Sequence, residues 1–240
     1  MRLDKFFTTV GLLSRRECAV AVKRGEITVN GMVPRDASVA VDPEKDAVAY
    51  RGETVAYRQF VYLWLNKPPG YVSATEDGHL PVVTELVPPE YRRLALFPCG
   101  RLDRDTVGLM LLTNDGALAH ALLSPRRAVP KVYRFETSAP LPSHAEAALS
   151  AGMRLGEVIC RPAHLAAEPS RMGGKLTLTE GKYHEVKRMM AALGAPVCYL
   201  ERIAFAGIPL DPALPRGECR PLREEELRIL LVAASSPRTE

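Results

Sequence analysis

One carboxylate stands out by its setting. Asp103 lies in the run GRLDRDTVGLMLLTNDG, residues 100–116. Gly100 and Gly108 flank it and allow tight or positive-φ backbone, so the loop between them can present charged side chains at a surface. A carboxylate held there can act as a nucleophile. Structural ion pairs are more common than catalytic acids, so the pattern alone favours an ion-paired loop carboxylate.

A second candidate group lies in the most basic window of the chain. Residues 117–135 contain no acid and carry His120, Arg126, Arg127, Lys131 and Arg134. Tyr133 lies within this window, and an aromatic ring between cations can stack on an unstacked base. A packing role is more common for a tyrosine, and a solvated loop is the corresponding alternative for the cations.

Cations that could face Asp103 occur in TEGKYHEVKRMMAALG, residues 179–194. The spacing of the apolar residues predicts a helix that Gly194 closes, with Lys187 and Arg188 near its start. A permanent cation opposite Asp103 would keep that carboxylate ionised, as a nucleophile requires. The lysine and the arginine could instead solvate the helix face.

The elements that must position these groups follow from the apolar pattern. Apolar runs predict strands, and capping boxes, glycines and prolines mark helix ends. We expect strands at 60–65, 94–98, 109–112, 132–136 and 175–179, and helices at 117–123, 143–152, 184–194 and 224–231. A capping box of Ser143 and Glu146 is expected to open the second of these helices, and Trp64 is expected in the core. Because strands and helices do not alternate strictly, the predicted fold class is α+β, with a mixed, antiparallel-rich sheet flanked by helices.

The chain is expected to divide into a small unit at 1–58 and a larger domain at 61–235, because its composition turns polar just before a new apolar run begins. In the small unit, Ser14 and Glu17 form a capping box that predicts the second of two short helices. The larger domain then contains every candidate catalytic group.

A hairpin and a charge asymmetry characterise the small unit. Residues 27–33 alternate in polarity and turn at Asn30-Gly31, which predicts a β-hairpin and therefore a helix-helix-hairpin module. Residues 1–35 hold seven Lys or Arg against three Asp or Glu, so positive charge is concentrated in the first half of the unit. This asymmetry suggests a nucleic-acid face.

Four ordered motifs together resemble a known family. GRLDRDTVGLMLLTNDG resembles the aspartate-bearing signature of the RNA pseudouridine synthases, in the branch that modifies ribosomal RNA and carries a small N-terminal RNA-binding module. The branch pattern also occurs in NKPPGYVSA, SPRRAVPKVYRF and TEGKYHEVKRMMAALG. The resemblance implies that Asp103 is the catalytic nucleophile, Tyr133 the ring beside the target base and Lys187 the cation that faces the aspartate. It also implies the α+β architecture.

The resemblance narrows the expected substrate. KYHEVKRM resembles the small-subunit enzyme more than the large-subunit enzymes, so the expected reaction is conversion of uridine 516 of 16S ribosomal RNA to pseudouridine. A 23S enzyme is the alternative within the family. Glu185 stands where family members usually carry glutamine, and its extra negative charge leaves the assignment between Lys187 and Arg188 less secure than that of Asp103.

The N-terminal motifs RLDKFF, SRREC and KRGEITVNG resemble the alpha-L RNA-binding module. Such a module would hold phosphates by counterion release without reading sequence. The candidate RNA-binding residues are Arg2, Lys5, Arg15, Arg16, Lys23 and Arg24 in this unit, and Arg101, Arg126, Arg127, Lys131, Lys182 and Arg188 in the larger domain. A solvated helix face is the simpler alternative for the helical members.

Composition bounds the remaining expectations. The net charge is only +4, so affinity for RNA must come from local clusters of charge. Five cysteines without a C-x-x-C pair give no sign of a disulfide framework or a zinc site. We expect a cytoplasmic monomer that needs no cofactor or metal, does not enter a membrane, and acts on 16S ribosomal RNA either free or in an assembling particle.

Two rival functions belong to other classes. A non-catalytic ribosome-assembly factor would explain the basic module without chemistry. A metal-dependent phosphoryl enzyme could use Asp103 and Asp105 as ligands, but Arg101 and Arg104 crowd that pair and no further acid cluster appears in the sequence.

Overall fold

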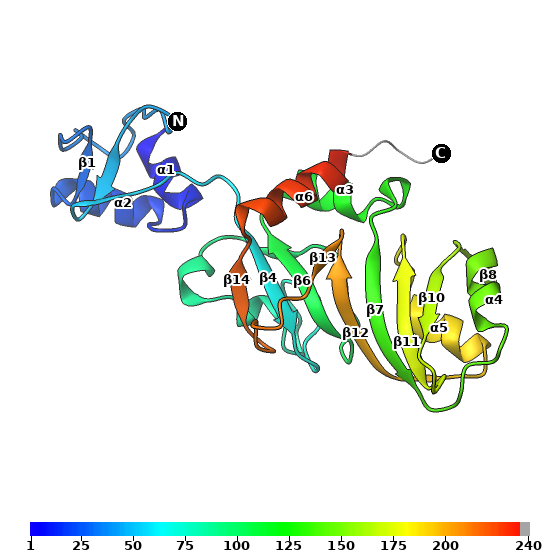
Figure 1. The fold of residues 1–240 in the computed structure, drawn as a ribbon. Helices are drawn as coiled ribbons and strands as arrows, with labels where there is room; N and C mark the ends of the chain where they lie inside the picture. The colour runs from blue at the N-terminus through cyan, green and yellow to red at the C-terminus, as the bar shows by residue number, and fades with distance from the viewer. Residues whose placement is uncertain (236–240) are drawn as a thin grey trace. The chain divides into compact units, whose positions relative to one another are not determined.

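The computed structural model describes residues 1–235 (Figure 1). Contacts between residues divide the chain into two compact units, residues 1–61 with 88–96 and residues 62–87 with 97 onward. The sequence predicted two continuous segments that meet near residue 60. In the structure, the segment 88–96 belongs with the first unit.

The first unit packs two helices on a small sheet. Its elements are α1 (Leu3–Thr9), α2 (Arg15–Lys23), β1 (Ile27–Val29), β2 (Val48–Tyr50) and β3 (Glu53–Thr54). The capping box at the start of α2 is confirmed, with Glu17 N donating to Ser14 Oγ and Ser14 N donating to the Glu17 carboxylate. Leu3, Phe6 and Phe7 are buried between the helices and the sheet.

The predicted hairpin at 27–33 is wrong in its second strand. The turn itself forms, because Asn30 and Gly31 both take positive φ and Val29 and Met32 exchange two backbone hydrogen bonds. The ladder ends there, and β1 pairs instead with the distant β2, antiparallel. Pro34 offers no N–H to extend a hairpin, and Met32 is 72% exposed, so the pairing does not continue beyond the bridge between Val29 and Met32.

The segment 88–96 contains the short 3-10 helix η2 (Pro89–Tyr91). The strand predicted at 94–98 is therefore too long, since only Phe97–Pro98 (β5) pairs, with β6. Within the first unit, Arg93 Nη1 donates to the Glu17 carboxylate at 2.6 Å, which joins this segment to the start of α2.

The second unit is built on one mixed sheet, which confirms the predicted α+β class. Its strands run in the order β10 (His164–Ala167), β11 (Gly173–Leu178), β7 (Lys131–Thr137), β12 (Val197–Phe205), β6 (Val107–Thr113), β4 (Tyr62–Lys67) and β14 (Cys219–Pro221), with β5 and β13 (Ile208–Pro209) at its margins. All strand pairs among the described residues are antiparallel except β6 with β12. At that parallel pair, a Cβ on Gly108 would lie 2.3 Å from the Arg202 carbonyl oxygen, so only glycine fits.

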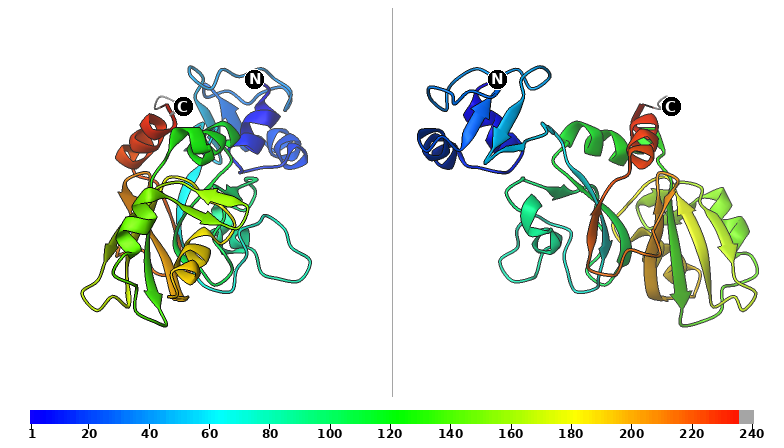
Figure 2. Two further views of the ribbon diagram at one scale, coloured as in Figure 1. Left: turned by 90° about the vertical axis from the view of Figure 1, so that its right-hand side faces the viewer. Right: turned by 60° about the vertical axis from the view of Figure 1, so that its left-hand side comes forward.

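Helices cover this sheet. α3 (Gly116–Leu123) and α6 (Glu224–Ser235) lie together across it (Figures 1 and 2). Between them and the sheet, Trp64 is fully buried with Leu109, Leu111, Leu122 and Leu230, which confirms Trp64 as a core residue. The remaining elements are α4 (Ala145–Ala151), α5 (Glu185–Ala192), the hairpin β8 (Met153–Leu155) with β9 (Val158–Cys160), and the 3-10 helices η1 (Val83–Leu86) and η3 (Pro125–Arg127).

The capping box predicted at Ser143 and Glu146 is wrong. α4 begins one residue later, its N-cap is His144, and no side chain caps it. The Glu146 carboxylate instead accepts hydrogen bonds from both terminal nitrogens of Arg171, each at 3.0 Å. A bidentate charge-assisted pair outcompetes a single bond to a backbone N–H.

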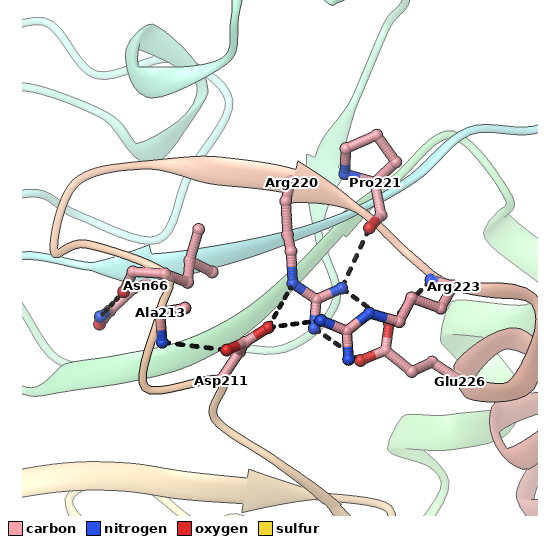
Figure 3. Close-up of polar contacts among 8 residues, drawn as sticks. Asn66, Asp211, Ala213, Arg220, Pro221, Arg223 and Glu226 are labelled. Carbon is pink, nitrogen blue, oxygen red and sulfur yellow. Dashed lines mark hydrogen bonds and ion pairs between the residues drawn. The ribbon is translucent and has the colours of Figure 1, made fainter.

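A polar network fixes the end of β14 to the start of α6 (Figure 3). Arg220 donates from both terminal nitrogens to the Glu226 carboxylate, at 2.8 and 2.6 Å. The backbone N–H of Arg223 donates to the same carboxylate at 2.8 Å, and the Arg223 guanidinium lies 2.9 Å from Asp211. Glu226 therefore orients the helix and neutralises a cation of the neighbouring strand at once.

Candidate active site

Asp103 lies in the loop that enters β6, and a buried lysine holds the shape of that loop. Lys67, at the end of β4, is fully buried. Its Nζ donates to the carbonyl oxygens of Asp103, Arg104 and Thr106, at 3.1, 3.3 and 2.8 Å. Burial lowers the pKa of Lys67 to about 8. No role for Lys67 was predicted from the sequence, although its place in the motif NKPPGYVSA was a signal that could have identified it.

Lys187 is the cation that contacts Asp103. Its Nζ lies 2.9 Å from Asp103 Oδ2 and 2.6 Å from Asp105 Oδ1. Desolvation by itself would lower the pKa of Lys187, but its hydrogen bonds to Asp105 and Asp103 outweigh it and raise that pKa. Arg188 points elsewhere, since its Nη2 donates to the Leu155 carbonyl oxygen at 2.9 Å.

His184 is a second neighbour of Asp103 that the sequence did not single out. Its Nε2 lies 3.4 Å from Asp103 Oδ1. The residue is the N-cap of α5 and takes a left-handed conformation with φ 49°. Its ring stacks on that of Tyr183, with 3.8 Å between centroids. The turn before α5 thus presents an imidazole and an exposed aromatic ring beside the carboxylate.

Tyr133 and Asp103 line two adjoining pockets. The smaller, about 70 Å³, has apolar walls from Leu178, Val186 and Leu200. The larger, about 310 Å³, is lined by Lys131, Arg202 and Tyr183 as well. Tyr133 is 8% exposed, on β7. The pair of pockets offers a ring, a carboxylate and apolar walls to one planar group.

The remaining predicted RNA-binding residues fall into two sets. Arg101 and Lys182 line both pockets. Lys131 lines the larger one and is buried. Arg126 and Arg127 lie in η3, next to Pro125 in that pocket's wall. The first unit holds Arg2, Lys5, Arg15, Arg16, Lys23 and Arg24, all of them exposed.

One group among residues 1–235 brings three metal-ligand atoms together. Cys160, Glu180 and Glu185 are buried, with one ligand atom of each within 4.8 Å of the others. Hydrogen bonds already occupy it: Glu180 Oε1 accepts from Lys182 Nζ at 2.9 Å and Glu185 Oε2 from Lys182 N at 2.8 Å. Burial, together with the hydrogen bond that the protonated Glu185 carboxyl donates to Glu180, raises the pKa of Glu185 to about 7. The extra charge expected at Glu185 is thus reduced by about half at neutral pH, and the group is better described as a proton-sharing carboxyl pair.

Comparison with known proteins identifies the fold and the reaction. The family model described as RNA pseudouridylate synthase matches residues 61–192, which include all three candidate catalytic residues. The chain belongs to this family. Its members are isomerases, so the protein is an RNA-modifying isomerase of the pseudouridine synthase type.

Individual relatives extend over nearly the whole chain. An uncharacterized RNA pseudouridine synthase of Bacillus subtilis is 44% identical over 96% of this chain and 98% of its own. The ribosomal small subunit pseudouridine synthase A of Escherichia coli is 38% identical over 95% and 98%. A crystal structure titled pseudouridylate synthase superposes with a TM-score of 0.67 at 34% identity, covering 96% of this chain and 99% of that one. Within residues 1–235 no helix combines the length and apolar character needed to cross a membrane.

Proposed function

We propose that the protein isomerises uridine 516 of 16S ribosomal RNA, with Asp103 as nucleophile. The observation that carries the proposal is the contact between Lys187 and Asp103 at 2.9 Å, beside a pocket lined by Tyr133. The similarity to a relative described as a ribosomal small subunit synthase supports the choice of RNA.

The chemistry fits this arrangement of groups. Uridine must leave its helix to be modified, and Tyr133 offers a ring on which the flipped base can stack. Breaking the bond between N1 and the sugar builds positive charge that the Asp103 carboxylate can trap or stabilise, and Lys187 keeps that carboxylate ionised. The uracil turns and rejoins the sugar through C5, which loses its proton while N1 gains one, so the atoms balance without water. Leu178, Val186 and Leu200 form a wall that excludes it.

The other parts of the molecule are assigned by the same proposal. Residues 1–58 act as an alpha-L type RNA-binding module, and residues 61–235 act as the catalytic domain. The protein works as a monomer in the cytoplasm, where its ribosomal substrate is made, and requires neither metal nor cofactor. The exposed cations of α2 support the first assignment.

The test is pseudouridine mapping of ribosomal RNA from cells with and without the gene. Pseudouridine at position 516 should disappear on deletion, return with the wild-type gene, and stay absent with Asp103→Asn. The purified Asp103→Asn protein should still bind the RNA, since the substitution removes charge from a loop that Lys67 holds through carbonyl oxygens. Restoration of the modification by Asp103→Asn would refute the nucleophile, and loss at another site would reassign the target.

A further inference from the structure

Two buried cations in the wall of the larger pocket play no part in the chemistry described above. Lys131 is 6% exposed and Arg202 is 2% exposed. They lie on the paired strands β7 and β12 and approach the same ring, Phe205, at 5.8 and 5.3 Å from its centroid. Both line the pocket that also contains Asp103 and Tyr133.

Neither cation is neutralised by a carboxylate. Lys131 Nζ donates to the Val129 carbonyl oxygen at 3.1 Å, and Arg202 Nε donates to the Leu109 carbonyl oxygen at 2.6 Å. These are their only hydrogen bonds within residues 1–235, and neither forms an ion pair there. Burial, together with the adjacent positive charge of Arg202, lowers the pKa of Lys131 to about 8. Two unpaired cations side by side are costly to bury, which a bound anion would relieve.

The covalent structure of the substrate determines which anion can reach Lys131 and Arg202. The smaller pocket combines apolar side chains with polar groups and is assigned to the uracil ring. It shares Asp103, Tyr133 and His184 with the larger one. The sugar attached to that base must then lie at the junction of the pockets, and the larger pocket is left for the chain that continues from the sugar. Each continuation begins with a phosphodiester, which carries one negative charge.

Resting on the proposed function, we propose that Lys131 and Arg202 form a subsite for a phosphodiester group flanking the flipped uridine. The Arg202 guanidinium has four N–H groups beyond the one given to Leu109, and guanidinium pairs with phosphate through two parallel hydrogen bonds. Lys131 adds a point charge. The subsite thus anchors the nucleotide backbone while the base enters the neighbouring pocket.

A purely structural role is the competing explanation for Arg202, because its bond to Leu109 ties β12 to β6 at their parallel pairing. The test therefore begins with the substrate. RNA is made with a neutral methylphosphonate at the linkage 5′ or 3′ to the target uridine, with a 2′-O-methyl group protecting that linkage. The reference RNA carries the same 2′-O-methyl group and an ordinary phosphate. Both are used as the free RNA or reconstituted particle on which the wild-type protein is active.

Wild-type protein should lose about 10- to 100-fold in single-turnover rate at subsaturating RNA for one of the two linkages, as expected for a lost charge-assisted hydrogen bond. On the reference RNA, the rate of Lys131→Met should be lower than that of wild type by a similar factor. Replacing the phosphate with methylphosphonate should then lower the rate of this variant little further, since the two changes remove the same contact. Lys175→Met, an exposed lysine on β11, is the matched control and should show the full methylphosphonate effect. Melting temperatures of the variants monitor folding.

The proposal is overturned if neither methylphosphonate slows the wild-type protein, a result that needs no variant to fold. It is also overturned if the two losses multiply in Lys131→Met, because independent effects mean that Lys131 does not contact the phosphate. If the wild-type protein forms no pseudouridine in the unmodified RNA or particle, the proposed target fails instead.

Discussion

Lys187 holds two carboxylates at once, and its geometry separates it from its neighbour in sequence. Lys187→Met keeps the length of the side chain and removes the charge that faces Asp103 and Asp105. We expect the single-turnover rate to fall by at least about 100-fold, because a charge-assisted contact at the reacting group is lost.

Arg188→Met is the matched control for Lys187→Met, since its guanidinium donates to the Leu155 carbonyl oxygen and not to Asp103. Its rate should stay within about threefold of wild type at saturating enzyme, the range of an effect below 1 kcal/mol. A large loss in Arg188→Met with little loss in Lys187→Met would show that the arginine is the cation in the working complex.

Glu185 gives a pH dependence of stability. Burial and the hydrogen bond that its protonated carboxyl donates to Glu180 raise its pKa to about 7, above its ordinary value of 4.5. The folded state thus holds this proton more tightly than the unfolded state. The stability that the proton supplies is fully present below pH 4.5 and is lost as the pH rises through 7.

Glu185→Gln removes that titration while keeping the shape of the side chain. We expect the variant to unfold like wild type near pH 4.5. At pH above 7 it should be more stable by roughly 3 kcal/mol, since the pKa rises from 4.5 to about 7 and one pKa unit corresponds to about 1.4 kcal/mol. Urea unfolding across the pH series measures this, with the exposed Glu168→Gln as control. A stability difference that does not change with pH would contradict the raised pKa.

At the scale of elements, α6 depends on a carboxylate that serves both the helix and the neighbouring strand. Burial alone would raise the pKa of Glu226, but hydrogen bonds from Arg220 and the Arg223 backbone outweigh it and lower that pKa. The stability that the ionised group contributes is therefore present above its ordinary pKa. That contribution is lost as the pH falls through the lowered value.

Glu226→Gln leaves the Arg220 guanidinium without its bidentate partner. We expect a loss on the order of 2 kcal/mol at neutral pH, measured as the shift in the urea midpoint. Glu224→Gln on the same helix is the control. The Glu224 side chain is 91% exposed, and its single ion pair, to Arg228, is long at 3.4 Å. That variant should change stability by less than about 0.5 kcal/mol. Equal effects of the two substitutions would show that the contacts of Glu226 in Figure 3 do not stabilise the fold.

At the scale of the whole molecule, the two units should differ in how they hold RNA. Arg15, Arg16, Lys23 and Arg24 are exposed on or beside α2 and can each release a counterion from RNA. Replacing all four with glutamine should weaken binding and flatten the plot of log affinity against log salt by up to about three units. Filter binding at several salt concentrations measures the slope.

The control is a variant in which glutamine replaces Lys45 and Arg58, two other exposed cations of the first unit. It tests whether removal of positive charge anywhere in this unit changes the salt dependence, and its slope of log affinity against log salt should stay close to that of wild type. An unchanged slope in the fourfold variant would remove α2 from the RNA interface. Substitution is a cleaner test than deletion of residues 1–58, because residues 88–96 pack with that unit and would lose their partner.

The sequence by itself determined what depends on neighbours along the chain. Apolar runs located β4, β6 and β7, the Ser14–Glu17 box located α2, and four motifs were enough to indicate the family. Local geometry and side-chain type decide these features, so they can be predicted before any tertiary contact is known.

Tertiary structure alone decided what depends on strand register and competition between distant partners. β1 pairs with the distant β2 and not with the residues that follow the Asn30-Gly31 turn. Glu146 accepts hydrogen bonds from Arg171 and does not form the expected capping box. Lys187 reaches Asp105 across 82 positions in the chain, and Arg202 reaches Leu109 across 93. The Arg202 contact depends on how the sheet aligns its strands, because a one-residue shift in register would turn that side chain to the opposite face. The Lys187 contact depends on the packing of α5 against β12, which brings the helix to the loop before β6.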